Sequence, residues 1–250
     1  MASRSEPKAH DAIQQLQQAY AKDSQGASLD LHFLPLDLMH IAAAKTCAHH
    51  FLAKEAHLDI LVCNAGVMAV EYMLTDDGVE QSFQVNHLTH FALFQALVPA
   101  MVQAARKSQH PSRLVNLSSL AHTFSSYNPL LTMDFTSKHA VNRHMGYGQV
   151  GKYMRYSQAK LAALLFARHV NRRFAPDEIR ASAVHPGLVA TNLYQKTPLA
   201  PFAHKVFISA SEGALSALYA ATSPQIEEEN SWCVIGGAAS WQTELRCACT

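Results

Sequence analysis

A tyrosine and a lysine four residues apart, Tyr156 and Lys160, form the part of the sequence best suited to catalysis. They lie in the segment RYSQAK (155–160), inside a stretch with helical periodicity, and residues four apart share one face of a helix. A free phenol has a pKa of about 10, too high for proton transfer near neutral pH. A neighbouring ammonium group favours the phenolate and lowers that pKa. The pair therefore predicts a tyrosine that acts as general acid or base.

Polar or small residues stand where four expected strands end, and parallel α/β sheets bind ligands at that edge. These residues are Asp37, Asn64–Ala65–Gly66, Ser118–Ser119 and the segment His185–Thr191. A Tyr-x-x-x-Lys pattern alone often occurs by chance, with a packed tyrosine and a solvated lysine. Four such strand ends in chain order, on either side of that helix, favour an active site instead.

The segments that must position these residues alternate between strands and helices. Strands are expected at 31–37, 58–63, 113–118, 179–185 and near 232–237, and helices at 6–22, 38–55, 78–107, 150–174 and 211–222. The near-continuous apolar run LDILVC (58–63) is typical of a parallel strand buried on both faces. Residues 120–149 are expected to be irregular. This alternation predicts an α/β fold with a parallel, doubly wound sheet.

Composition narrows the function classes. The 250 residues suit one large domain, and 20 basic against 19 acidic residues, without a basic run, argue against a nucleic-acid partner. Five scattered cysteines read as free thiols in a reducing compartment, so we expect a cytoplasmic protein. The longest apolar stretch, 91–102, is too short to span a bilayer, and the N-terminus has no secretory signal.

Five motifs in this order and spacing resemble the short-chain dehydrogenase/reductase family, in its retinol-dehydrogenase-like and WW-domain-oxidoreductase-like branch. They are NAG (64–66), FQVNHLTHF (83–91), RLVNLSS (113–119), YSQAK (156–160) and HPGLVAT (185–191). The resemblance covers about residues 1–228, taken as the short-chain dehydrogenase/reductase domain, and leaves 229–250 as a divergent C-terminal tail. It implies a Rossmann-type fold and hydride transfer between a nicotinamide cofactor and a carbonyl or alcohol.

The resemblance also implies a tetrad of catalytic residues. Tyr156 would be the proton donor for carbonyl reduction or the base for alcohol oxidation. Lys160 would lower the pKa of Tyr156 and hold the nicotinamide ribose. Ser119, the second serine of its pair, would donate a hydrogen bond to the substrate oxygen. Asn86 would hold a water that connects Lys160 to solvent as a proton relay.

Cofactor contacts follow from the same resemblance. The expected cofactor-binding residues are Arg4, Asp37, Asn64, Ala65, Gly66, Tyr156, Lys160, Val189 and Thr191. Arg4 would pair with the 2′-phosphate, which favours NADP over NAD, although a lone N-terminal arginine is often only a solvated charge. Asp37 would hydrogen-bond the adenine edge or, almost equally well, cap the following helix. No metal is expected, since no histidine or cysteine pattern has ligand spacing.

The family's phosphate-binding signature, Thr-Gly-x-x-x-Gly-x-Gly, is absent, and the first glycine of the chain is Gly26. The similarity begins at the end of the second family strand. We therefore expect a Rossmann-type sheet that is N-terminally incomplete, without the first strand, the glycine loop and the first helix. Backbone N–H groups of that loop normally meet the pyrophosphate, so weak NADPH binding and marginal stability are expected.

Two functions remain in competition. The leading one is NADP-dependent reduction of a lipophilic ketone or aldehyde, or oxidation of the matching alcohol. Apolar residues of the loop that covers the site in the family suggest a retinoid-like, steroid-like or secondary-metabolite substrate; they are Leu188, Leu193, Tyr194, Leu199 and Phe202. The alternative is a truncated, non-catalytic homologue that binds cofactor poorly and acts, if at all, by binding a partner. The sequence leaves the oligomeric state open.

Overall fold

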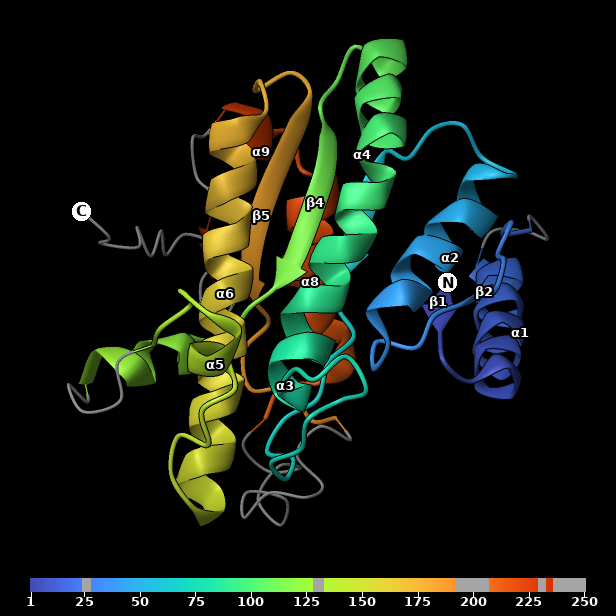
Figure 1. Ribbon diagram of the computed structural model, residues 1–250. Coiled ribbons are helices and arrows are strands. Elements are labelled where there is room, and N and C mark those ends of the chain that lie inside the picture. Colours follow the sequence, from blue (N-terminus) through green and yellow to red (C-terminus); the bar gives the residue numbers. More distant parts are fainter. Residues whose placement is uncertain (24–27, 128–132, 192–206, 229–232, 236–250) are drawn as a thin grey trace.

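The computed structural model describes residues 1–23, 28–127, 133–191, 207–228 and 233–235 (Figure 1). Its strands are β1 (Ala2–Ser3), β2 (Leu34–Pro35), β3 (Ile60–Cys63), β4 (Ser112–Leu117), β5 (Ile179–His185) and β6 (Cys233–Ile235). Its helices are α1 (Glu6–Asp23), α2 (Ile41–Leu52), α3 (Gln81–Phe83), α4 (Thr89–Ser108), α5 (Lys138–Val141), α6 (Gly148–Arg173), α8 (Ala210–Thr222) and α9 (Gln225–Glu228). A π-helical turn, η1 (Gln84–Leu88), and a 3-10 helix, η2 (Leu120–Tyr127), complete the chain order.

All the strand pairs between these elements are parallel, which confirms the predicted α/β, Rossmann-type class. The strands form two sheets, one of β1 and β2 and one in the order β3-β4-β5-β6. The break therefore lies between the β1–β2 pair and β3. Figure 1 shows β1, β2 and α1 standing apart from β4 and β5, on the far side of α2 and α4.

The four-stranded sheet is covered on both faces. In Figure 1 helices α4 and α6 lie on one face of β4 and β5, and α8 lies behind β4. The main core joins Phe94 of α4 and Phe166 of α6 to Leu114 and Ile179 of the two central strands. The rings of Phe94 and Phe166 meet edge to face, with their centroids 5.3 Å apart. This packing fixes α6, the helix expected to carry the catalytic pair, against the sheet.

The helix predicted at 78–107 is a continuous helical run, Gln81–Ser108, with the π-helical turn η1 near its start. By length and composition it is the one helix among the described residues that could cross a membrane. Half of its most apolar window is buried inside the fold, as in the core helix of a folded domain. A π turn inserts one residue into the helix, and such turns are frequent at functional sites.

One strand is shorter than predicted, and the last strand lies where it was expected, near 232–237. The strand expected at 31–37 is reduced to Leu34–Pro35, because its partner β1 has only two residues and Pro35 has no N–H to donate. Strand β6 lies inside the segment expected to be a tail and pairs with the end of β5. The rest of that tail lies outside the described residues. The irregular stretch 120–149 contains η2 and the single turn α5.

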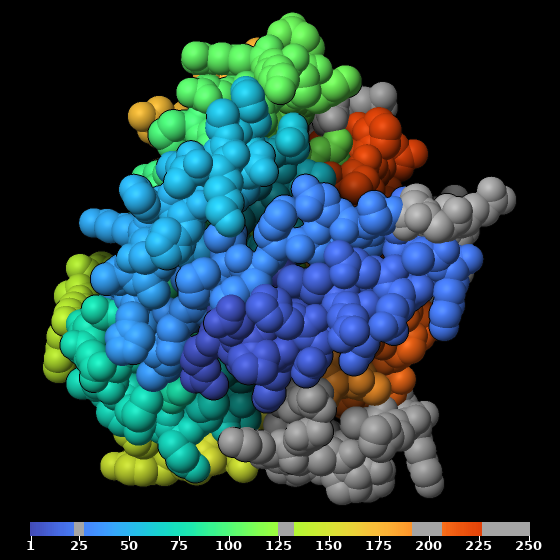
Figure 2. All heavy atoms as spheres, turned by 90° about the vertical axis from the view of Figure 1, so that its right-hand side faces the viewer, coloured from blue at the N-terminus to red at the C-terminus, as the bar shows by residue number. Residues whose placement is uncertain are grey.

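Apolar side chains are exposed on the side of the molecule where the two sheets part. Ile60 and Val62 of β3 are 38% and 44% exposed, although Leu61 between them packs into the core. On α1, Ala9 and Ile13 are buried while Leu16 and Tyr20 are exposed. Figure 2 shows the N-terminal elements, in dark to lighter blue, lying across this side of the molecule.

Candidate active site

The carboxyl ends of β3 and β4 and the middle of α6 meet around Tyr156 and Lys160. Both side chains are buried, each 6% exposed, and the Lys160 Nζ atom lies 5.5 Å from the centre of the Tyr156 ring. The same ammonium group donates a hydrogen bond to the Leu117 carbonyl oxygen at 2.6 Å, at the last residue of β4. Burial lowers the pKa of Lys160 to about 8. The fold thus places a buried lysine beside the Tyr156 ring, while its effect on the pKa of the phenol stays a prediction.

The two serines after β4 have different surroundings. The Ser118 hydroxyl is buried and donates to the Lys160 carbonyl oxygen at 2.8 Å, so it ties β4 to α6. Ser119 is half-buried, and its Oγ accepts a hydrogen bond from the Ala121 N–H at 3.2 Å. Accepting that bond does not use the hydroxyl proton of Ser119. The geometry therefore favours Ser119 over Ser118 as the donor to a substrate oxygen.

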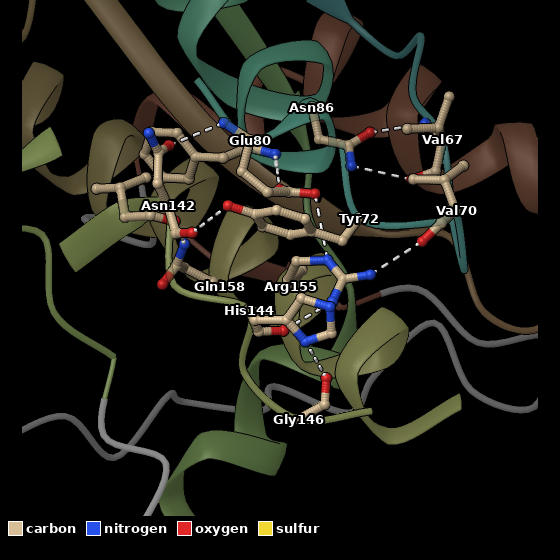
Figure 3. A network of polar contacts seen from close by, with 12 residues as sticks. Val67, Val70, Tyr72, Glu80, Asn86, Asn142, His144, Gly146, Arg155 and Gln158 are labelled. Atoms are coloured by element: carbon tan, nitrogen blue, oxygen red, sulfur yellow. Dashed lines mark hydrogen bonds and ion pairs between the residues drawn. The ribbon is translucent and has the colours of Figure 1, made fainter. Parts of the chain in front are cut away.

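Asn86 lies in the π turn η1 and clamps the backbone of Val67 (Figure 3). Its Oδ1 accepts from the Val67 N–H at 2.8 Å, and its Nδ2 donates to the Val67 carbonyl oxygen at 2.9 Å. A side-chain amide has one acceptor atom and two N–H donors, so one N–H remains for a water. The relay role of Asn86 stays a prediction, while its contact with the turn after β3 is plain.

Gly66 lies directly against this clamp. A Cβ atom at Gly66 would stand 2.4 Å from Asn86 Oδ1 and 3.9 Å from Lys160 Nζ. Only glycine lets the backbone approach the amide this closely. Asn64, Ala65 and Gly66 are all exposed at the carboxyl end of β3, so their backbone is open to a ligand.

His90, which the sequence did not point to, binds the same turn through Ala65. Its Nε2 lies 2.8 Å from the Ala65 carbonyl oxygen, and since a carbonyl only accepts, Nε2 carries the proton. Burial lowers the pKa of His90 to about 4, so the ring is neutral at pH 7. Asn86 and His90 are four residues apart in FQVNHLTHF, a spacing that could have revealed their shared role.

His122 is a second residue near the site that the sequence motifs did not predict. Its Nδ1 lies 2.6 Å from the carbonyl oxygen of Ser119, within the first turn of η2. The ring therefore fixes the backbone from which the Ser119 hydroxyl projects. Ser119 and His122 are three positions apart, a spacing that matches no sequence motif by itself. The 3-10 turn brings the histidine ring to the serine carbonyl.

The other expected cofactor residues are spread around this centre. Arg4 is exposed just after β1, on the small sheet. Asp37 accepts a hydrogen bond from the Met39 N–H at 3.0 Å in the turn before α2. The alternative prediction that it caps this helix is wrong, because the N-cap of α2 is His40. Val189 packs against Gly213 of α8, where a Cβ atom would lie 2.4 Å from its methyl carbon. Thr191 is exposed at the edge of the described residues.

Part of the expected substrate loop cannot be placed. Leu193, Tyr194, Leu199 and Phe202 lie outside the described residues, and Leu188 before them is about half exposed. Within the described ranges, no group of three or more histidine, cysteine, aspartate or glutamate side chains is arranged to hold a metal ion.

Proteins with similar sequences identify the family of this chain. A family model described as short chain dehydrogenase matches residues 1–147. The chain is 33% identical over 235 residues to the short-chain dehydrogenase TIC 32 A, chloroplastic, of Brassica napus, covering 91% of this chain and 69% of that protein. It is 33% identical over 233 residues to retinol dehydrogenase 14 of Mus musculus, covering 90% of this chain and 65% of that protein.

Solved structures show the same fold at lower identity. The Pseudomonas aeruginosa RhlG/NADP active-site complex is 20% identical with a TM-score of 0.65, covering 95% of this chain and 84% of that one. The 3-ketoacyl-(acyl-carrier-protein) reductase of Brucella melitensis complexed with NADH is 15% identical with a TM-score of 0.67, covering 95% and 85%. At these identities the likeness concerns the fold alone.

Proposed function

The chain belongs to the short-chain dehydrogenase family of oxidoreductases, and on that premise we propose that it transfers hydride between NADP and a lipophilic ketone, aldehyde or matching alcohol. The observation that carries the proposal is the buried pair on α6. Lys160 Nζ stands 5.5 Å from the Tyr156 ring and bonds to the end of β4, directly before the two serines. Catalytic groups from two elements thus converge on one edge of the sheet, where parallel α/β folds bind ligands.

In carbonyl reduction the Tyr156 hydroxyl gives its proton to the substrate oxygen. The Ser119 hydroxyl donates a hydrogen bond to that oxygen as negative charge builds on it. The Lys160 ammonium then stabilises the phenolate that remains on Tyr156. A bound nicotinamide supplies the hydride to the carbonyl carbon, or accepts it in the reverse direction. In alcohol oxidation each proton moves the opposite way, with the Tyr156 phenolate as base.

The residues around the centre fit a dinucleotide in part. The exposed backbone of Asn64, Ala65 and Gly66 would lie along it, and Lys160 would reach the nicotinamide ribose. Val189 and Thr191 would contact the carboxamide, and Asp37 the adenine edge. Solved neighbours include complexes with NADP and with NADH, so they do not choose between the two. The exposed guanidinium of Arg4 after β1 supports NADP, whose 2′-phosphate needs a cation.

The substrate class rests on the apolar surroundings of the phenol. Met68 and Ala69 pack against the Tyr156 ring, and Ala121 of η2 joins them from the other strand end. A wall of this kind suits a lipophilic carbonyl, including those of secondary metabolism. We place the protein in the cytoplasm, because Cys47 and Cys63 are buried free thiols. We also take residues 1–228 as the dehydrogenase domain and residues 229–250 as its divergent tail.

Two measurements on the purified 250-residue chain test this function. Calorimetric titration with NADPH and with NADH reports cofactor binding and preference. Loss of NADPH absorbance with a retinoid aldehyde, a steroid ketone and a small polar ketone reports turnover. We expect NADPH to bind better than NADH and the lipophilic carbonyls to be reduced faster than the polar one. No turnover of any carbonyl or alcohol, despite cofactor binding, contradicts the proposal.

One observation favours a second function, a non-catalytic protein that binds a partner. The sheet is split between β1 and β3, and the β3 edge carries the exposed Ile60 and Val62. An open strand edge with apolar side chains is a surface on which another chain can pair. If neither NADPH nor NADH binds while the chain melts cooperatively, this second function replaces the first.

A further inference from the structure

Arg155, the residue directly before Tyr156, is a buried cation that holds three separate segments (Figure 3). It is 1% exposed, and its Nε lies 3.3 Å from Glu80 Oε1. Its Nη1 donates to the His144 carbonyl oxygen at 2.7 Å and its Nη2 to the Val70 carbonyl oxygen at 3.1 Å. A single side chain thus joins the catalytic helix α6 to the start of α3 and to two loops.

Its partner Glu80 also connects separate segments of the chain. Glu80 is 0% exposed, and it caps α3 by accepting a hydrogen bond from the Phe83 N–H at 2.9 Å. Its own N–H donates to Asn142 Oδ1 at 2.9 Å. Burial raises the pKa of Glu80, and the Arg155 guanidinium opposes that rise. The backbone N–H groups of Ser82 and Phe83 oppose that rise more strongly, so Arg155 is one of several groups that stabilise the buried carboxylate.

The loop that follows Gly66 is held at both ends by these groups. Asn86 clamps Val67, and Arg155 binds Val70. Between them Ala69 has φ of 54°, in the left-handed region that is unusual for a residue other than glycine. Such a conformation persists only when its surroundings hold it.

This loop is the wall against which Tyr156 packs. Met68 and Ala69 form a buried cluster with the Tyr156 ring. Beyond the loop, the Arg155 guanidinium stacks over the ring of Tyr72 at 5.5 Å, and the Tyr72 hydroxyl donates to the Asn142 carbonyl oxygen at 2.9 Å. Figure 3 shows Tyr72 lying between the Arg155 and Asn142 ends of this network.

We propose that the Arg155–Glu80 pair is a positioning device for Tyr156: it holds the Met68–Ala69 wall against the phenol ring and so fixes where the phenolic oxygen meets the substrate. The inference rests on the proposed function. Arg155 acts through Tyr156 and the loop, and it need not touch substrate itself.

A contribution to stability does not by itself explain why a buried Arg155–Glu80 ion pair is present. Replacing a buried ion pair by apolar residues of similar volume is often neutral or stabilising, because desolvation offsets the attraction between the charges. A planar guanidinium, by contrast, can bind a carboxylate and two carbonyls in fixed directions at once. That directional hold is what a phenol needs if its oxygen must stay within hydrogen-bond reach of the reacting atom.

The test compares a double variant, Arg155→Met with Glu80→Leu, with Arg155→Lys and the control Arg172→Met. The double variant removes both charges together and so leaves neither buried alone. Arg172 lies on the same helix, exposed in its last turn. For each protein we would measure the thermal midpoint, the NADPH affinity, and kcat and KM for carbonyl reduction.

We expect the double variant to melt somewhat below the wild-type midpoint, because Glu80→Leu also removes the cap of α3. The folded variant should bind NADPH as well as the wild type, with KM unchanged and kcat about 10- to 100-fold lower. Arg155→Lys should recover part of that loss, and Arg172→Met should behave as wild type. A fall in kcat that follows the loss of folded protein overturns the proposal, as does a double variant with wild-type kcat.

A signal that needs no turnover separates this inference from the proposed function. With ¹³C-labelled tyrosine, the Tyr156 ring resonance is identified by its loss in Tyr156→Phe. We expect it to be single and sharp in the wild type and broadened or split in the double variant. If it stays sharp and unmoved, the positioning role is wrong, even for a chain that reduces no carbonyl. If it broadens in a chain without turnover, only the proposed reaction fails.

Discussion

The ammonium group of Lys160 stands 5.5 Å from the centre of the Tyr156 ring while it donates to the Leu117 carbonyl oxygen at 2.6 Å. The lysine is therefore held by the end of a strand and not only by its own helix. Its charge is presented to the phenol and to the turn at Gly66 from a fixed place. The end of β4, the turn after β3 and α6 thus lie around one buried cation.

Tyr156→Phe should remove most carbonyl reduction and leave NADPH binding nearly intact. The phenol supplies the proton, and general acid–base groups typically contribute about 10²- to 10⁴-fold in rate. A turnover assay checks the loss of reduction, and calorimetric titration of the same preparation checks NADPH binding. Tyr147→Phe is the control, since Tyr147 is exposed on the surface just before α6. Wild-type turnover by Tyr156→Phe would show that another group moves the proton.

Lys160→Met should abolish reduction yet raise the free energy of unfolding near neutral pH. Burial lowers the pKa of Lys160 to about 8, so the unfolded chain binds this proton more tightly than the folded one. The wild type therefore gains stability as pH rises from about 8 toward the unfolded value of about 10.4. Below about pH 8 the free energy of unfolding of the variant should exceed that of the wild type by at most about 3 kcal/mol. Loss of the hydrogen bond to Leu117 reduces this difference. Urea unfolding at pH 7 and pH 10 checks it, and a difference that does not shrink at pH 10 contradicts it.

Gly66→Ala should destabilise the protein by about 1–3 kcal/mol through overpacking. Its Cβ would stand 2.4 Å from Asn86 Oδ1, so the amide must release the Val67 backbone. Urea unfolding of Gly66→Ala, Asn86→Ala and the double variant forms a complete cycle. We expect the double variant to lose clearly less than the sum, because the two changes break one contact. Additive losses would mean that the clamp and the glycine are independent.

The protein should lose stability on acidification, partly through His90. Its folded pKa of about 4 lies below the unfolded value of about 6.5, so its contribution is complete above pH 6.5 and disappears as pH falls toward 4. The full contribution is up to about 3 kcal/mol. In His90→Gln the free energy of unfolding should fall less steeply between these pH values. His50→Gln, at an exposed position on α2, is the control and should keep the wild-type slope.

Arg4→Glu should lower the preference for NADP over NAD. The change places a carboxylate where the 2′-phosphate would bind and repels it. The ratio of NADPH to NADH affinity, measured by calorimetry, reports the effect. Lys8→Glu makes the same charge change on the exposed surface of α1 and should leave the ratio nearly unaltered. An unchanged ratio in Arg4→Glu would show that Arg4 does not read the phosphate.

Local patterns were enough to predict most of the longer elements and to place Tyr156 and Lys160 on one helix. The strand at 179–185 was predicted with its observed bounds, because apolar and polar residues alternate along it and a proline follows it. Tyr156 and Lys160 share a helix face through the 3.6-residue period alone. The family motifs extended this to the strand ends, where Asn64–Gly66 and Ser119 stand.

What the tertiary structure decided lies between residues far apart in the chain. The split of the sheet, the choice between the two serine hydroxyls, and the hold of Asn86 and His90 on the turn after β3 all depend on how separate elements pack. Arg155 and Glu80 read as ordinary charges in the sequence and form a buried pair only because α6 and α3 meet. Helical and strand periods act over a few residues, whereas such contacts are set by the packing of the whole core, which no local pattern encodes.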